Sequence, residues 1–282
     1  MMVCFTVNMS ATRPYLLAFW LCLWAQISAA HETWIAPEVY RAPPGASIQI
    51  DIRNGQDFSG ASLPWLDWWI DRFVAVEGPV ERPLTGRLGD IPATRITPIA
   101  EGLMVIGLQS TRDRHPWTDW EAFRDFAASK GLHGVTEGHE SRGWPRVGFV
   151  EVYRRHLKAL IGIGTALGND RALGFELEFV ALTNPYSSDF AGLMEVLLLE
   201  DGDPLPAAPV TMFASHATGA VVETRVLTDE YGTFRFSTEA QTRYLLDAVT
   251  MRSAPADTAG SWYSLWAGMT FEASLVTRGR SH

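Results

Sequence analysis

The chain has 282 residues, 47% of them hydrophobic, and its formal net charge of -9 at pH 7 makes it acidic. This acidity disfavours nucleic acid and anionic lipid as partners and mildly favours cations. The two cysteines, Cys4 and Cys22, both lie within the first thirty residues. A protein that begins after them has neither a disulfide nor a thiolate metal site.

The first thirty residues have the pattern of an export signal. Tyr15–Ile27 is an apolar run behind the basic residue Arg13, and small residues precede a predicted cut after Ala30. The run is too short to span a membrane as a helix. We therefore expect residues 1–30 to be a signal peptide. Since no second long apolar stretch follows, the mature protein should be periplasmic and have no transmembrane segment.

Cleavage after Ala30 makes His31 the first residue of the mature protein. Its free α-amine and its imidazole Nδ1 can then close a chelate ring on Cu(II), Ni(II) or Zn(II), which no internal histidine can do. The alternative is that His31 simply begins a strand at a frayed terminus. The metal interpretation makes His31 the first candidate ligand.

Residues 31–116 read as short strands and turns. Ser47–Arg53 alternates between polar and apolar residues, which is typical of a half-buried strand. Phe73–Val76 and Leu103–Leu108 are further strand candidates. The pattern predicts an N-terminal β-sandwich-like domain.

The hydrophobic period then changes to that of a helix. Thr118 and Glu121 form a capping box, and apolar residues recur at helical spacing until Gly131. A second helix is predicted over Phe149–Ile161, with His156 as a core histidine on its apolar face. We expect residues 117–167 to be a helical insertion.

The loop between these two predicted helices carries imidazoles and carboxylates. His133, Glu137 and His139 are of the ligand types that suit a borderline divalent metal, and the loop is the best companion for His31. The spacing of its histidines matches no standard ligand pattern, so a solvated connector is the alternative. The candidate metal ligands are therefore His31, His133, Glu137 and His139.

Residues 168–273 return to a β pattern. Six strand candidates with intervening turns predict a C-terminal β-sandwich domain. Asp229 is expected to cap its own turn through an Asx hydrogen bond. Residues 274–282 are expected to be a disordered tail. The predicted fold is mainly β, with two β-sandwich-like domains and a helical insertion between them.

Other motifs lend little support to catalysis. The sequence has no Gly-x-Ser-x-Gly elbow, no P-loop and no His-Glu-x-x-His motif. The aromatic cluster of Trp65, Trp68 and Trp69 fits either a glycan-stacking platform or a buried edge. We expect the protein not to be an enzyme.

Several motifs together resemble a known family of exported proteins. They are His31-Glu32-x-Trp34, Tyr153–Leu160, Leu182–Tyr186, Thr228–Phe236 and Ser264–Glu272. Spread over residues 31–273, they are similar to a domain-of-unknown-function family described as the periplasmic component of nickel or cobalt uptake systems. Its C-terminal domain resembles transthyretin-like and carboxypeptidase regulatory-like β-sandwiches.

The resemblance implies a role in handling divalent transition metals, with a membrane metal transporter as a partner. One departure concerns a histidine that members often carry just before the methionine equivalent to Met251. This chain has Thr250 there, so a ligand is lost or replaced if that histidine binds metal.

The sequence thus predicts a periplasmic protein that binds nickel, cobalt or copper, as an accessory to metal uptake. The Irving–Williams order favours Cu(II) for an amine–imidazole chelate, whereas the resemblance favours nickel or cobalt. The alternative function is a structural or adhesive surface module that binds protein or glycan and uses no metal.

Overall fold

The computed structural model describes residues 31–273. The predicted signal peptide (1–30) and C-terminal tail (274–282) lie outside the described residues. Strands make up most of the regular structure, which confirms the predicted mainly-β class. Within residues 31–273, no helix is long and apolar enough to cross a membrane.

The elements follow one another in a simple order along the described chain. The strands before the helices are β1 (Glu32–Pro37), β2 (Arg41–Ala42), β3 (Ile48–Gln56), β4 (Ser59–Leu63), β5 (Ile70–Glu77), β6 (Val80–Pro83), β7 (Thr94–Ile96), β8 (Gly102–Ser110) and β9 (Asp113–Trp117). The helices are α1 (Trp120–Ser129) and α2 (Val135–Ser141). The strands after them are β10 (Phe149–Ile163), β11 (Leu177–Ala181), β12 (Leu193–Glu200), β13 (Asp203–Pro204), β14 (Pro209–Ser215), β15 (Val221–Leu227), β16 (Thr233–Ser237), β17 (Thr242–Ser253) and β18 (Trp262–Ala273).

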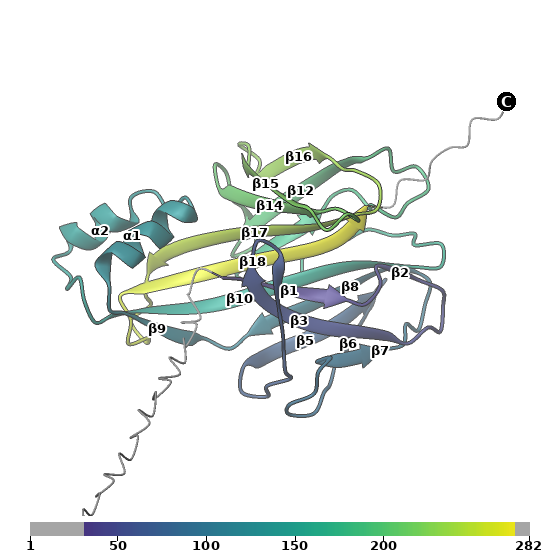
Figure 1. Cartoon of the computed structure of the whole chain (residues 1–282), viewed down its shortest axis with the longest axis horizontal. Coiled ribbons are helices and arrows are strands. Elements are labelled where there is room, and N and C mark those ends of the chain that lie inside the picture. Colours follow the sequence, from purple (N-terminus) through teal and green to yellow (C-terminus); the bar gives the residue numbers. More distant parts are fainter. Residues whose placement is uncertain (1–30, 274–282) are drawn as a thin grey trace, which may run out of the picture.

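One long sheet runs through the middle of the molecule (Figure 1). In the described residues its strand order is β15-β14-β17-β18-β10-β8-β5-β6, and β2 and β9 also pair with β10. The long strands β10 and β18 lie parallel, with His156 opposite Ala267. The two predicted β regions, 31–116 and 168–273, therefore contribute strands to the same sheet.

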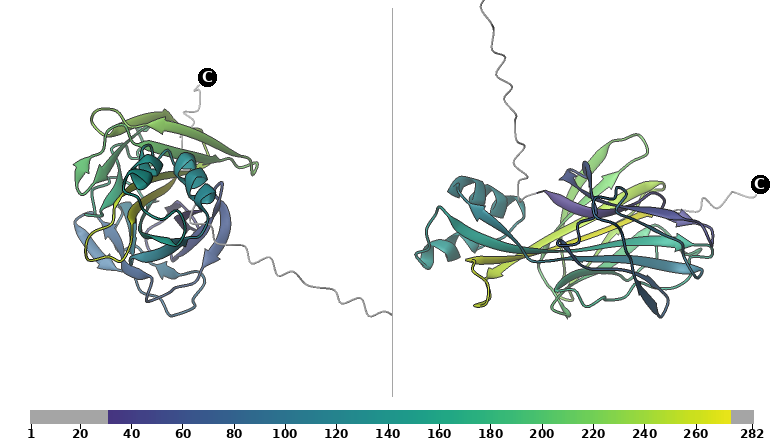
Figure 2. Two further views of the ribbon diagram at one scale, coloured as in Figure 1. Left: turned by 90° about the vertical axis from the view of Figure 1, so that its left-hand side faces the viewer. Right: turned by 90° about the horizontal axis from the view of Figure 1, so that it is seen from below.

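Two smaller sheets cover the opposite faces of this sheet, so the body has three layers (Figure 2). Alternation along β8 shows the arrangement. Met104 and Ile106 belong to the core shared with the β1-β3-β4-β7 sheet, whereas Leu103 and Val105 belong to the core shared with the β11-β12-β13-β16 sheet. A strand buried on both faces needs apolar side chains at successive positions.

The predicted helix over Phe149–Ile161 is wrong, because this segment is the central strand β10. Val152 and Leu160 pack into one core, while Leu157 and Ile161 pack into the other. A strand with two buried faces has no simple apolar alternation, and its apolar residues also fit a helical period. The helical part of the predicted insertion is thus limited to α1 and α2.

The two helices pack against one end of the central sheet (Figure 2, left). The cap of α1 is Asp119, whose carboxylate accepts hydrogen bonds from the backbone N–H groups of Glu121 and Ala122. The expected capping box of Thr118 and Glu121 is therefore wrong, because the cap lies one residue later and Ala122, three residues after Asp119, has no side chain that could complete a box. Gly131 follows the end of α1 with φ of 66°, which confirms its predicted role as the stop.

Candidate metal-binding site

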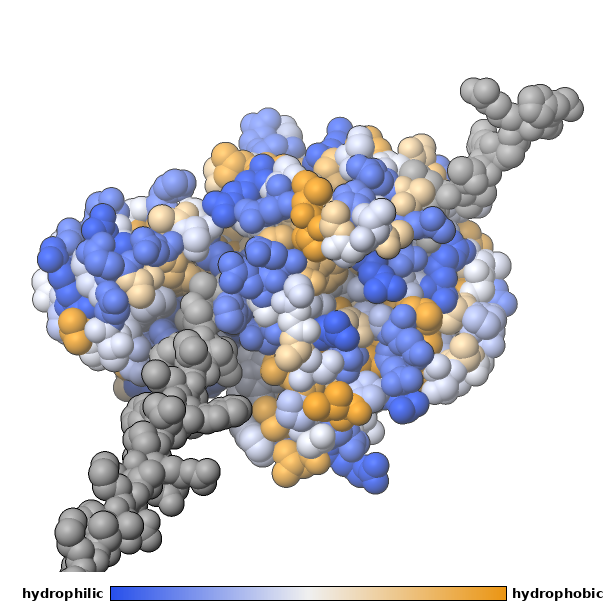
Figure 3. Space-filling model, in the orientation of Figure 1, coloured by the Kyte–Doolittle hydropathy of each residue, from blue (hydrophilic) through white to orange (hydrophobic). Residues whose placement is uncertain are grey.

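A cavity of about 460 Å³ lies where the described chain begins. The start of β1, the β3–β4 turn, helix α1 and the β14–β15 pair form its wall. The lining residues are His31, Glu32, Gln56, Asp57, Ala122, Asp125, Phe126, Ser129, Lys130, Thr211, Phe213, Glu223 and Arg225. The space-filling view shows a recess between the helical lobe and the rest of the molecule (Figure 3).

A buried ion triad lies beside this cavity, and two of its members, Glu32 and Lys130, line it. The Lys130 ammonium lies 2.9 Å from Glu32 Oε1 and 2.9 Å from Asp247 Oδ2. The same ammonium lies over the ring of Trp266, 5.1 Å from its centroid. Lys130 is the residue that ends α1, so the triad ties the helix to the beginning of the chain and to β17.

The triad leaves one polar atom without a partner. Glu32 Oε2 is buried and has no hydrogen-bond partner among the described residues. An unpaired buried oxygen of a carboxylate costs free energy, and such groups mark strain, catalysis or an unplaced ion or water. The orphan oxygen belongs to the residue directly after His31.

The pKa values of Glu32 and Lys130 reflect burial and pairing. Burial raises the pKa of Glu32 and Asp247 adds to the rise, while Lys130 opposes both. Burial alone lowers the pKa of Lys130, but attraction to Asp247 and Glu32 outweighs burial and raises it. Lys130 thus stays charged. The surroundings of the Glu32 carboxylate favour either binding of a proton or the approach of another cation.

The lining of the cavity is acidic overall. Four carboxylates line it (Glu32, Asp57, Asp125 and Glu223), against the two cations Lys130 and Arg225. The formal excess of two negative charges favours a cation over an anion at this place.

The four sequence-predicted ligands do not converge. His31 is half-buried at the cavity, whereas His133 and Glu137 are exposed and line a separate cavity of about 260 Å³ on the helical hairpin. A backbone hydrogen bond and one from Thr136 lower the pKa of Glu137, with a smaller contribution from His133. Within residues 31–273, no group of three or more histidine, cysteine, aspartate or glutamate side chains is arranged to hold a metal.

His139 has a structural role that its sequence context did not reveal. Its imidazole is fully buried, 4.3 Å from the ring of Phe149 between centroids. Nδ1 accepts a hydrogen bond from Trp262 Nε1 at 3.0 Å, and Nε2 lies 3.0 Å from the Pro145 carbonyl oxygen, to which it donates. Since both ring nitrogens are occupied, His139 is not free to bind a metal. It joins α2 to β18.

A second buried lysine lies on the other face of the central sheet. Lys158 contacts Asp170 at 2.8 Å and donates to the carbonyl oxygens of Arg171 and Phe179, each at 2.9 Å. Its three ammonium protons therefore have three acceptors. Glu178, nearby, accepts from three backbone N–H groups of residues 173–175. This cluster is complete and needs no further ion.

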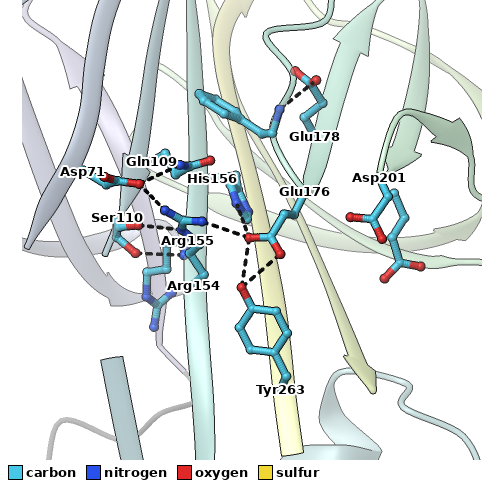
Figure 4. A network of polar contacts seen from close by, with 12 residues as sticks. Asp71, Gln109, Ser110, Arg154, Arg155, His156, Glu176, Glu178, Asp201 and Tyr263 are labelled. Carbon is cyan, nitrogen blue, oxygen red and sulfur yellow. Dashed lines mark hydrogen bonds and ion pairs between the residues drawn. The ribbon is translucent and has the colours of Figure 1, made fainter. Parts of the chain in front are cut away.

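A third polar network surrounds Glu176 (Figure 4). Glu176 accepts hydrogen bonds from Tyr263 at 2.9 Å and from Arg154 at 3.1 Å. His156 is buried beside it, and neither ring nitrogen has a hydrogen-bond partner among the described residues. Burial lowers the pKa of His156 to about 4. His156 is thus a buried, neutral histidine, as expected, but it lies on a strand and is unsatisfied.

Sequence reasoning found His31 but missed Lys130 and Asp247. One signal was available, because the chain has 23 lysine and arginine residues and just two of them, Lys130 and Lys158, are lysines. Both are buried in ion pairs. The rarity of lysine was therefore a usable signal, because both lysines place a compact ammonium against buried carboxylates.

The fold and the cavity define a mainly-β protein of three layers, with an acidic cavity at the start of the described chain. The chain belongs to the family described as Domain of unknown function (DUF4198), whose model matches residues 28–252. This membership confirms the coarser part of the resemblance stated above. No curated protein matches the chain significantly.

One similar solved structure is a tetra-tandem repeat in the extending region of a large adhesion protein. It is 10% identical, the match covers 86% of this chain and 49% of that one, and the TM-score is 0.20. The chain thus spans about half the length of that structure. A likeness at this level carries no argument about function.

Proposed function

We propose that this protein binds one divalent transition metal ion (nickel, cobalt or copper) in the cavity beside His31, after removal of residues 1–30 in the periplasm. It acts there as a non-enzymatic accessory to a membrane metal transporter. The observation that carries the proposal is that Glu32 Oε2 is buried without a hydrogen-bond partner among the described residues. Glu32 directly follows His31, and both residues line the acidic cavity.

The ligands follow from the chemistry of these two residues. The α-amine and imidazole Nδ1 of His31 close a six-membered chelate ring with the metal, and Glu32 supplies a carboxylate oxygen. Two nitrogens and one oxygen suit Cu(II) and Ni(II) better than Mg(II) or Ca(II), which prefer oxygen. The remaining positions are filled by water or by a ligand from a transport partner.

The excess of carboxylates supports a cation further. Asp57, Asp125 and Glu223 are all at least partly exposed at the cavity wall. Their field raises the local concentration of a dication even without direct contact. Lys130 opposes this attraction. It donates a hydrogen bond to Glu32 Oε1, whereas Oε2 has no partner among the described residues.

Calorimetry with Cu(II) and Ni(II) tests the proposal on protein that begins at His31. We expect one strong site. A single glycine placed before His31 converts the amine to an amide, and we expect this extension and His31→Ala each to lower the affinity about 100-fold or more, a change of about 2.7 kcal/mol. Intact mass of the exported protein checks that it begins at His31.

Two histidines outside the cavity serve as matched controls. His133→Ala, on the helical hairpin, and His282→Ala, beyond the described residues, should leave the affinity unchanged. Equal losses in His133→Ala and His31→Ala would move the site to the helical loop. Binding weaker than about 1 mM, or about -4 kcal/mol, in the protein that begins at His31 would favour the metal-free surface module.

The aromatic cluster gives that alternative little support. Trp65 is 7% exposed and stacks on Phe73, while Trp68 is 66% exposed. Trp69 is half-buried. The three tryptophans therefore do not form one exposed platform, and a glycan-binding function has no separate observation in its favour.

A further inference from the structure

Strand β15 (Val221–Leu227) is an open edge of the central sheet. Within the described residues it pairs with β14 alone, without a break in register over seven residue pairs. Six of its seven residues are exposed, among them Val222 at 50% and Leu227 at 64%. Open edges of regular strands are templates for pairing with another strand, and natural proteins usually block them with lysine, proline or a bulge. β15 has none of these.

The sequence of β15 is complementary to itself when read in the opposite direction. An antiparallel pair of two β15 strands centred on Thr224 places Glu223 opposite Arg225 of the second copy, and Arg225 opposite Glu223 of the second copy. The same register places Thr224 opposite Thr224. Val222 then faces Val226, and Val221 faces Leu227. Opposite charges, paired threonines and paired β-branched residues are the favourable cross-strand combinations.

We propose that two copies of this chain associate through β15, in antiparallel register about a two-fold axis at Thr224. The interface is isologous, as a two-fold dimer requires, and joins the two central sheets into one. Charge complementarity selects this occupant over an unrelated strand, since every charged position of β15 meets the opposite charge.

In the single chain, the charged residues of β15 form an ion pair with each other that the dimer would replace by cross-strand pairs. Glu223 and Arg225 point to the same face of the strand and form an ion pair with each other at 2.9 Å. Both side chains are substantially exposed, 40% for Glu223 and 57% for Arg225. An exposed ion pair within one strand contributes little, so replacing it by two cross-strand pairs has a small cost.

The dimer also brings the two candidate metal cavities together. Glu223 and Arg225 line the cavity described above. In the two-fold pair, the equivalent residues of the second copy lie at the same face and next to this rim. The pairing does not depend on a bound metal, so its test is independent of the proposed metal function.

The expected affinity is modest. A seam of one strand pair adds about six backbone hydrogen bonds and buries less than the about 1,200 Å² of a standard interface. We expect a dimer that dissociates in the micromolar range, which analytical ultracentrifugation of the chain from residue 31 onward can measure without metal.

Charge reversal provides the decisive test. Glu223→Arg places arginine opposite arginine twice in each dimer, and Arg225→Glu places glutamate opposite glutamate twice. Each should weaken the dimer about tenfold or more. The double variant E223R/R225E restores every opposite-charge pair and should recover the dimer. An equimolar mixture of the two single variants should form heterodimers.

Two further measurements keep the test independent of folding. Glu195→Arg alters an exposed cross-strand pair with Arg235 and should leave the dimer unchanged. With no native cysteine from residue 31 onward, Thr224→Cys should oxidise to a covalent dimer faster than the exposed control Ser141→Cys. A monomer throughout the micromolar range, a dimer indifferent to Glu223→Arg, or equal oxidation of the two cysteine variants would each overturn the proposal.

Discussion

The two lysines of this chain stand in similar surroundings with different outcomes. Lys158 lies between two sheets with its ammonium fully bonded, and its side chain is 1% exposed. Lys130 lies at a cavity with 8% exposure, bonded to two carboxylates, one of which keeps an unpaired oxygen. Both are ion pairs that the fold has taken out of water, but only the second is incomplete.

The comparison separates a structural polar cluster from a candidate site. Asp170 beside Lys158 also accepts from the backbone N–H groups of Arg171 and Ala181, and the neighbouring Glu178 accepts from that of Leu173. At Lys130, in contrast, Glu32 Oε2 has no hydrogen-bond partner among residues 31–273, and Glu32 lines the same cavity as His31. A buried polar group left unsatisfied persists where something else completes it.

The largest expected effect comes from removing the complete cluster's cation. Lys158→Met leaves Asp170 buried without its counter-ion, and we expect the free energy of unfolding to fall by about 3–5 kcal/mol. Lys130→Met should lower it by only about 1–2 kcal/mol, because Lys130 and Glu32 line a cavity that can admit water once the ammonium is removed. Urea denaturation at pH 7 measures both.

Neutralising the partner provides the control for this pair. Asp170→Asn combined with Lys158→Met should recover part of the loss, since no buried charge is then unpaired. If the two lysine variants lose equal stability, the cavity does not relieve the Lys130 triad and the contrast between the clusters disappears.

The pH dependence of metal affinity should involve the cavity at His31 and not the Lys158 cluster. Both nitrogens of the chelate must be deprotonated to bind a metal, and in model peptides an α-amine and an imidazole lose their protons at about pH 7.7–8.0 and about pH 6.5. Between pH 7 and pH 5 the affinity should therefore fall about 1000-fold, measured by competition with a chelator of known affinity. Lys158→Arg should bind with the same pH profile. A fall of tenfold or less would mean that the amine is not a ligand.

Much of the fold was accessible from the sequence, and the errors have physical causes. Strands with one wet face, such as Ile48–Gln56, were predicted by their alternation. The turn at Asp229 was also predicted, and its carboxylate accepts from the backbone N–H groups of Tyr231 and Thr233. β10 was mistaken for a helix because both of its faces are buried.

β15 was missed for the opposite reason. Nearly all of its residues are exposed on both faces of the strand. Its sequence therefore does not alternate between apolar and polar residues, which is the signal by which half-buried strands are predicted. The position of the candidate site was partly predictable, because His31 follows the predicted signal peptide. The ion triad beside the cavity was not predictable, because Lys130 and Asp247 are 117 residues apart and come together only in the folded chain.

Removing the ammonium at the incomplete cluster should sharpen the contrast in binding. Lys130→Met eliminates a positive charge next to Glu32 and frees Oε1. We expect Cu(II) or Ni(II) to bind about tenfold more tightly, or about 1.4 kcal/mol, in calorimetry at pH 7. Lys158→Met, assayed at a temperature where it is folded, should bind as the unsubstituted protein does. Weaker binding in Lys130→Met would show that Lys130 positions Glu32 rather than competes with the metal.

The smallest effect on metal affinity is expected at His156. Like Glu32, it has buried atoms without a hydrogen-bond partner among the described residues, but it does not line the cavity at His31. Burial lowers its pKa to about 4, below the unfolded value of about 6.5. Between these values the unfolded chain binds more protons than the folded one, so His156 lowers stability progressively as the pH falls from 6.5 to 4. Glu151 acts in the opposite direction, because burial raises its pKa to about 7. His156→Met should therefore remove about 2 kcal/mol of the acid-induced loss, measured by urea denaturation at pH 4.5 and pH 7, and should leave metal affinity unchanged. An unchanged difference between the two pH values would mean that His156 is neutral, or charged, in both states of the protein.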